Sequence, residues 1–140
     1  MKSSKFWIAV LAAGFAANVF DFIVQGNLLW KMFYANLPAL YNQTGNPLWL
    51  TLTDFIAVAV FAWFYDVVYK SFEGGMKGGM KFGLYAGIFL NFPAWLFAHF
   101  LFNGFPYGLA WVLTIYGIIW GMVVGSIIGM MYKKETATNK

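Results

Sequence analysis

Six polar side chains interrupt the long apolar stretches of this sequence, and they are the candidate ligand- or ion-binding residues: Asn18, Asp21, Gln25, Asp54, Asn91 and His99. The first three are spaced by three and four residues, which places them on one face of a helix. Asn91 and His99 are eight residues apart and return to nearly the same face of another helix. Ionisable groups within apolar segments are costly, so they usually face a partner, a cavity or the interior of a bundle.

Two carboxyl groups, one imidazole and several amides could do three kinds of chemistry. They could form a hydrogen-bonded polar cluster that fixes helix register. They could carry protons or cations, since carboxylate and imidazole groups are the usual devices for that purpose inside a membrane. Asp21, Asp54 and His99 could instead hold a metal ion or a polar ligand, although their spacing is not local to one helix. The sequence leaves these alternatives open and indicates no particular cofactor.

An enzymatic role is the weakest of the interpretations. Asp54 and His99 could act as an acid–base pair, but nothing in their spacing is specific to catalysis. The chain contains no cysteine, which excludes disulfides, thiolate nucleophiles and thiolate metal sites. We therefore predict no catalytic residues.

Four apolar stretches must position these side chains, and they cover residues 6–30, 48–69, 82–102 and 107–132. Each reaches the roughly 20 residues that a helix needs to cross a bilayer. The whole chain is 61% hydrophobic and 10% charged, whereas soluble domains are about one quarter charged. The continuous apolarity also differs from the short alternating segments of a membrane barrel. We predict an all-α, four-transmembrane-helix bundle that forms one domain over residues 1–140.

The three connections between these stretches differ in composition. Residues 31–47 contain Pro38 and Pro47 and predict an external loop or short surface segment. Residues 71–81 combine paired glycines with spaced lysines and suggest a mobile turn at the membrane surface. Residues 103–106 predict a tight turn that makes the last two helices antiparallel. Pro93 should kink the third helix and free a backbone carbonyl near Phe89 or Leu90.

Lysine placement predicts the orientation. Only Lys31 falls on one side of a four-span chain, and the other side receives the remaining eight: Lys2, Lys5, Lys70, Lys77, Lys81, Lys133, Lys134 and Lys140. Because positive residues accumulate on the cytoplasmic side, we predict cytoplasmic N- and C-termini and a location in the cytoplasmic (inner) membrane. With a rise of 1.5 Å per residue, four polar residues then fall in the outer half of the predicted bundle, away from the cytoplasm: Asp21, Asp54, Asn91 and His99.

Glycines recur every four residues in the last two predicted helices. The helix-packing candidates are Gly83, Gly87, Gly117, Gly121, Gly125 and Gly129, with Gly79 in register before them. Small residues on one face let two helices approach closely, which matters in lipid because apolar burial no longer drives association. This pattern predicts a tight helix contact, either inside one chain or between copies.

The same features limit the partners. Membrane lipid is the expected surrounding, and a homo-oligomer or partner membrane subunits are compatible with the glycine face. Nucleic acid is not expected, because the lysines flank apolar runs and do not cluster on a soluble face.

Short segments spread over the chain carry a resemblance: Gly26-Asn27-Leu28-Leu29 with Tyr34, Gly83-Leu84 with Gly87 and Pro93, and the glycine-rich last span. In these segments the chain resembles small four-helix prokaryotic membrane proteins of an uncharacterised family. The resemblance implies a four-helix bundle and carries no activity with it. Two functions remain as hypotheses: a binding or structural component of a membrane assembly, and a small proton- or cation-coupled transporter or channel-like protein.

Overall fold

The computed structural model describes residues 4–40 and 45–132, and every regular element within them is helical. The long helices are α1 (Ser4–Ile23), α3 (Pro47–Val68), α4 (Gly75–Leu101) and α5 (Tyr107–Met131). Three short helices follow α1: the π-helix η1 (Val24–Leu29), α2 (Trp30–Met32) and the 3₁₀-helix η2 (Tyr34–Asn36). One 3₁₀-helix, η3 (Tyr69–Ser71), follows α3. Four continuous helical stretches of this described part are long and apolar enough to cross a membrane: Ser4–Met32, Pro47–Ser71, Gly75–Leu101 and Tyr107–Met131. The prediction of an all-helical chain with four helices of membrane-spanning length is confirmed.

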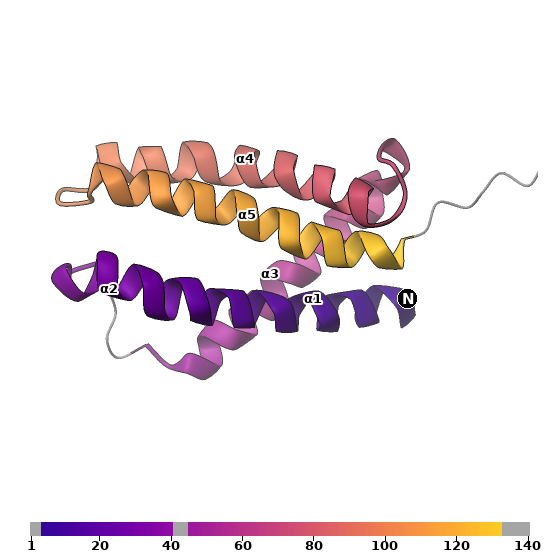
Figure 1. Cartoon of the computed structure of the whole chain (residues 1–140), viewed down its shortest axis with the longest axis horizontal. Helices are drawn as coiled ribbons and strands as arrows, with labels where there is room; N and C mark the ends of the chain where they lie inside the picture. Colours follow the sequence, from indigo (N-terminus) through magenta and orange to yellow (C-terminus); the bar gives the residue numbers. More distant parts are fainter. Residues whose placement is uncertain (1–3, 41–44, 133–140) are drawn as a thin grey trace, which may run out of the picture.

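The helices form a hairpin and a crossing pair. Figure 1 shows α4 and α5 side by side, with α1 running along the other side of α5 and α3 crossing obliquely behind. The α4–α5 contact is the most extensive in the structure, and α1 packs on both α3 and α5. The backbones of α3 and α4 stay further apart, and these helices touch through side chains, with the ring of Phe82 in α4 lying against Phe61 and Tyr65 of α3.

Large apolar side chains are exposed on each of the long helices. Phe15 on α1, Trp63 on α3, Phe89 on α4 and Ile115 on α5 are each about half or more exposed. Soluble monomers rarely show apolar surface of this extent. Such a surface is suited to lipid.

Two buried clusters hold the helices together. The larger one joins α1, α3 and α5 with one aromatic ring from α4, and its fully or nearly fully buried members include Ala13, Ala17, Val58, Ala62, Tyr65, Phe82, Val124 and Ile128. The alanines give α1 and α3 flat faces, so their backbones approach closely. A smaller cluster of Leu29, Leu109 and Leu113 attaches the extension of α1 to the start of α5.

The predicted glycines of α4 and α5 lie against one another within a single chain. A methyl group at Gly79 would overlap the carbonyl oxygen of Gly125, and one at Gly83 would overlap that of Gly121. At Gly87 it would come within 2.8 Å of the Cα of Ile118. Only hydrogen fits at these positions, so glycine spacing sets the distance between the two helices.

The remaining predicted glycines lie along the same contact. The side chain of Asn91 occupies the space beside Gly117, and a methyl group at Gly129 would lie 2.8 Å from the Cα of Gly79.

The turn between α4 and α5 is as tight as predicted. Gly104 has φ +82°, a left-handed conformation that side chains disfavour. The amide of Phe105 donates to the carbonyl of Phe102 at 3.2 Å. At the start of α3, the side-chain oxygen of Asn46 caps the helix by accepting from the amide of Leu48 at 2.9 Å.

The prediction of a mobile turn over residues 71–81 is wrong for most of its length. α4 begins at Gly75 and includes both lysines and the second glycine pair. Glycine weakens an isolated helix, but here Gly79 gains close contact with α5. The amide of Gly75 also donates to the carbonyl of Tyr132 at 3.1 Å, which ties the start of α4 to the end of α5.

Two further boundaries differ from the prediction. The first span does not stop at residue 30 but continues through η1 and α2 to Met32, and η2 lies within the segment expected to be a loop. Residues 41–44 of that segment lie outside the described residues. Pro93 lies inside α4, which runs from Gly75 to Leu101 as one element.

Candidate intramembrane carboxyl site

Asp21 and Asp54 place two carboxyl groups from different helices close to one another. Asp21 lies near the end of α1, and Asp54 lies two turns into α3. Both side chains are partly buried. A hydrogen bond between two carboxyl groups needs a proton on at least one of them, because an ionised carboxylate only accepts. Two carboxyl groups this close could share one proton between α1 and α3.

Tyr116 of α5 is the third member of this cluster. Its hydroxyl donates a short hydrogen bond to Oδ1 of Asp21. Its ring stacks on that of Phe20, with centroids 5.6 Å apart and planes 5° from parallel. The stacking fixes the direction of the ring, so the hydroxyl is held toward the carboxyl group.

Gln25 and Tyr34 extend the cluster along the continuation of α1. The Tyr34 hydroxyl donates to Oε1 of Gln25 at 3.2 Å. Gln25 also lies beside Tyr116. A chain of polar contacts thus runs from Asp54 through Asp21, Tyr116 and Gln25 to Tyr34.

The π-helix η1 starts three residues after Asp21 and contains Gln25. Its wider turn is matched by Asn27, whose side chain donates to the carbonyl of Phe22, five residues back, at 2.8 Å. Short π-segments are rare and occur often at functional sites. Here the segment follows Asp21 closely and holds Gln25, so it forms part of the site.

Asn18 and Asn91 make other contacts. Asn18 donates to the carbonyl of Gly14 in its own helix at 2.9 Å. Asn91 donates to the carbonyl of Gly87 at 2.9 Å and accepts from the indole of Trp95 at 3.2 Å. Both amide side chains therefore donate to backbone carbonyls of their own helices. Asn91 also lies at the α4–α5 contact, beside Gly117.

His99 stabilises the turn between α4 and α5. Its Nδ1 lies 2.7 Å from the carbonyl oxygen of Phe105, and because a carbonyl only accepts, Nδ1 carries the proton in this contact. The ring lies beside that of Tyr107, with centroids 5.2 Å apart.

The expected meeting of His99 with the two carboxyl groups does not occur. Within residues 4–40 and 45–132, no three His, Asp or Glu side chains come close enough together to hold a metal ion. The metal-ligand set Asp21, Asp54 and His99 is therefore corrected to a carboxyl pair with a tyrosine. The physical reason is that His99 lies in the last turn of α4, where it contacts Phe105 and Tyr107 at the α4–α5 turn.

The sequence predicts neither Tyr34 nor η1 as part of the site, and it marks Tyr116 only as a polar side chain that enters from the last span, not as a candidate ligand. Tyr116 carried a signal, since it lies in the middle of an apolar span, away from the interfaces where tyrosine is normally enriched. A π-segment has no comparable signal in one sequence.

Fold and site together define an all-helical chain with four helices suited to a membrane and a carboxyl pair between two of them. Comparison of the chain with models of known protein families, with curated proteins and with solved structures gives no match.

Proposed function

We propose that this chain is a small integral protein of the cytoplasmic membrane, crossing it four times with both termini inside. The four apolar helices and their exposed aromatic and aliphatic side chains support the membrane location. The distribution of lysines, eight against one in the four-span arrangement, supports the orientation.

We further propose that it binds and releases a proton at the Asp21–Asp54 pair, as one step of proton- or cation-coupled transport. The observation that carries this function is the proximity of two partly buried carboxyl groups from two different apolar helices. Intramembrane carboxyl groups are typical of proton and ion pathways.

Charge balance gives the step its chemistry. With one proton, the pair has a single negative charge, and Tyr116 donates to it. When that proton leaves, two carboxylates remain in contact and repel each other in a medium of low dielectric constant. Either α1 and α3 separate locally, or a monovalent cation replaces the proton. Both responses couple the occupancy of the site to the contact between the two helices.

A structural role is the second candidate. The carboxyl pair joins α1 to α3, and Tyr116 joins α1 to α5. In that case the cluster fixes the helix register of a binding or structural component of a membrane assembly.

Reconstitution into liposomes with an internal pH-sensitive dye distinguishes the two functions. We compare the natural chain with Asp21→Asn and Asp54→Asn, which keep the size of each side chain but remove the group that can ionise. Asp66→Asn is the matched control, because Asp66 lies at the opposite end of α3 from Asp54, near Tyr132.

Transport predicts that an imposed cation or pH gradient drives proton flux, and that each site variant reduces the flux at least tenfold while Asp66→Asn does not. If none of the variants changes the flux and Asp21→Asn and Asp54→Asn change only the melting temperature in detergent, the structural role is correct and the transport function is refuted.

A further inference from the structure

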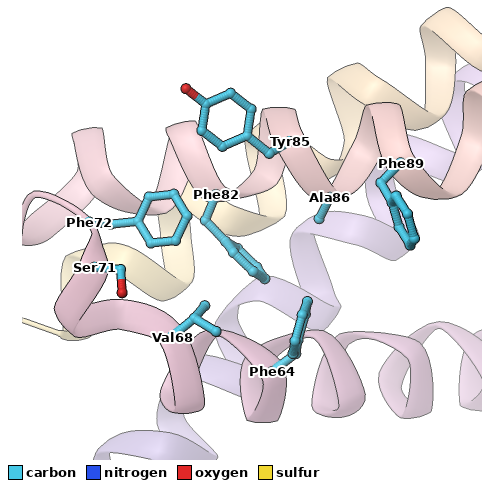
Figure 2. A pocket seen from close by; sticks show the side chains of 8 residues that line it. All are labelled: Phe64, Val68, Ser71, Phe72, Phe82, Tyr85, Ala86 and Phe89. Atoms are coloured by element: carbon cyan, nitrogen blue, oxygen red, sulfur yellow. The ribbon is translucent and has the colours of Figure 1, made fainter.

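A groove lies between the second half of α3 and the first half of α4. Figure 2 shows Phe64 and Val68 on one side and Phe82, Ala86 and Phe89 on the other, with Ser71 at one end. Its volume is about 430 Å³. It exists because α4 uses its glycine face to pack on α5, which leaves a different face of α4 beside α3.

The groove is apolar and opens toward the surroundings of the helices. Phe64 is 49% exposed and Phe89 is 79% exposed. Both flanking helices are of the kind that crosses a membrane. At this depth water has no hydrogen-bonding partners along the aromatic walls, so hydrocarbon is the medium that fills the space favourably.

Close to Ser71, which lines one end of the groove, the sequence contains several lysines. Lys70 precedes Ser71, and Lys77 and Lys81 are exposed in the first turns of α4. Lys81 forms an ion pair with Glu73 at 2.7 Å. Residues 66–81 contain three lysines against Asp66 and Glu73, which leaves one net positive charge beside an exposed hydroxyl group. This combination favours an anionic headgroup over a zwitterionic one.

We propose that the groove is a binding site for an anionic phospholipid, with one acyl chain against Ala86 and the headgroup phosphate at Ser71 and Lys70. The groove matches a single flexible chain better than a helix of a second copy. A helix about 10 Å wide occupies roughly 420 Å³ for each turn of 5.4 Å, so the groove would accept only about one turn.

This site is independent of the carboxyl pair. Ser71 follows Asp54 by 17 residues on one continuous helical stretch, which corresponds to about 25 Å along the axis. The lipid site depends only on the membrane location of the helices, so its failure would leave the proposed proton binding untouched, and the reverse also holds.

Binding is measured by native mass spectrometry of the protein released from detergent, after addition of phosphatidylglycerol or phosphatidylcholine with identical acyl chains. Ala86→Phe fills the groove. Ala94→Phe is the matched control, because Ala94 is an exposed residue of the same helix that does not line the groove. Lys70→Gln tests the headgroup contact.

We expect phosphatidylglycerol to bind at least fivefold more tightly than phosphatidylcholine. Ala86→Phe should abolish the tight binding, Ala94→Phe should retain it, and Lys70→Gln should reduce the preference by about fivefold, the effect of one lysine near an anionic headgroup. Equal binding of the two lipids, or equal binding by the two alanine variants, would overturn the proposal. The proposal would also be overturned if the protein forms a dimer that Ala86→Phe dissociates while the amount of bound lipid stays the same.

A second measurement uses the natural chain and does not depend on the folding of any variant. Phosphatidylglycerol with a photoreactive acyl chain is crosslinked in nanodiscs, and the labelled peptides are mapped. Labelling should concentrate on residues 64–71 and 82–89 and should be competed by unlabelled phosphatidylglycerol. Uniform labelling of all four long helices would contradict a specific site.

Discussion

Replacement of Gly83 by alanine should destabilise the protein, whereas the same replacement at Gly108 should not. At Gly83 the new methyl group would overlap the carbonyl oxygen of Gly121 and lie 2.9 Å from the Cα of Met122. Those are backbone atoms, which cannot rotate away as a flexible side chain would. The α4 and α5 helices must therefore move apart.

The magnitude follows from two opposing effects. Overpacking of a close contact costs about 1–3 kcal/mol, and the upper end applies here because both sides are backbone. Alanine regains about 1 kcal/mol of helix propensity relative to glycine. We expect a net loss of about 2 kcal/mol in the free energy of unfolding for Gly83→Ala.

Gly108 is the matched control. It is also a glycine of the α4–α5 hairpin, but the nearest atom to an added methyl group is Cε1 of Phe33, at 4.0 Å. Gly108→Ala should therefore be neutral or more stable by about 0.5 kcal/mol, from propensity alone.

Both variants are measured by equilibrium unfolding in mixed detergent micelles, followed by circular dichroism. The argument is refuted if Gly83→Ala is at least as stable as the natural chain, or if the two variants lose stability equally. Either result would mean that glycine spacing does not set the distance between α4 and α5.

Three further variants test individual contacts. Tyr116→Phe removes the donor to Asp21 and should cost about 1–3 kcal/mol, measured by unfolding in micelles, because a partly buried acceptor loses its partner. His99→Phe removes the bond to the Phe105 carbonyl and should cost about 1 kcal/mol without changing proton flux; a tenfold loss of flux would contradict its structural assignment. Burial raises the pKa of the Tyr132 hydroxyl above its ordinary value of about 10, so ionisation opposes folding. The natural chain should therefore lose stability as the pH rises above about 10, and melting curves of Tyr132→Phe should show a smaller loss; an equal loss would refute this assignment.

Helix number and length could be predicted from the sequence because they depend on continuous apolarity, which a single chain displays directly. The start of α4 could not. Glycines and lysines in residues 74–81 have the composition of a turn, and only their contact with α5 makes them helical. A tertiary contact decided the local structure, and local composition does not contain it.

The site was predictable in part. Asp21, Gln25 and Asp54 were singled out by their polarity within apolar spans, and the structure places all three in one cluster. His99 and Asn91 have the same polarity but lie where α4 faces α5. Which helices pack together decides which polar residues meet, and helical periodicity alone does not determine that arrangement.

The most direct test of the shared proton is infrared spectroscopy of the protein in membranes at neutral pH. The natural chain should show the carbonyl absorption of a protonated carboxylic acid. Asp21→Asn and Asp54→Asn should each alter that same absorption, and Asp66→Asn should leave it unchanged. The absence of a protonated carboxyl group, or an absorption that responds to only one of the two aspartates, would contradict the hydrogen-bonded pair.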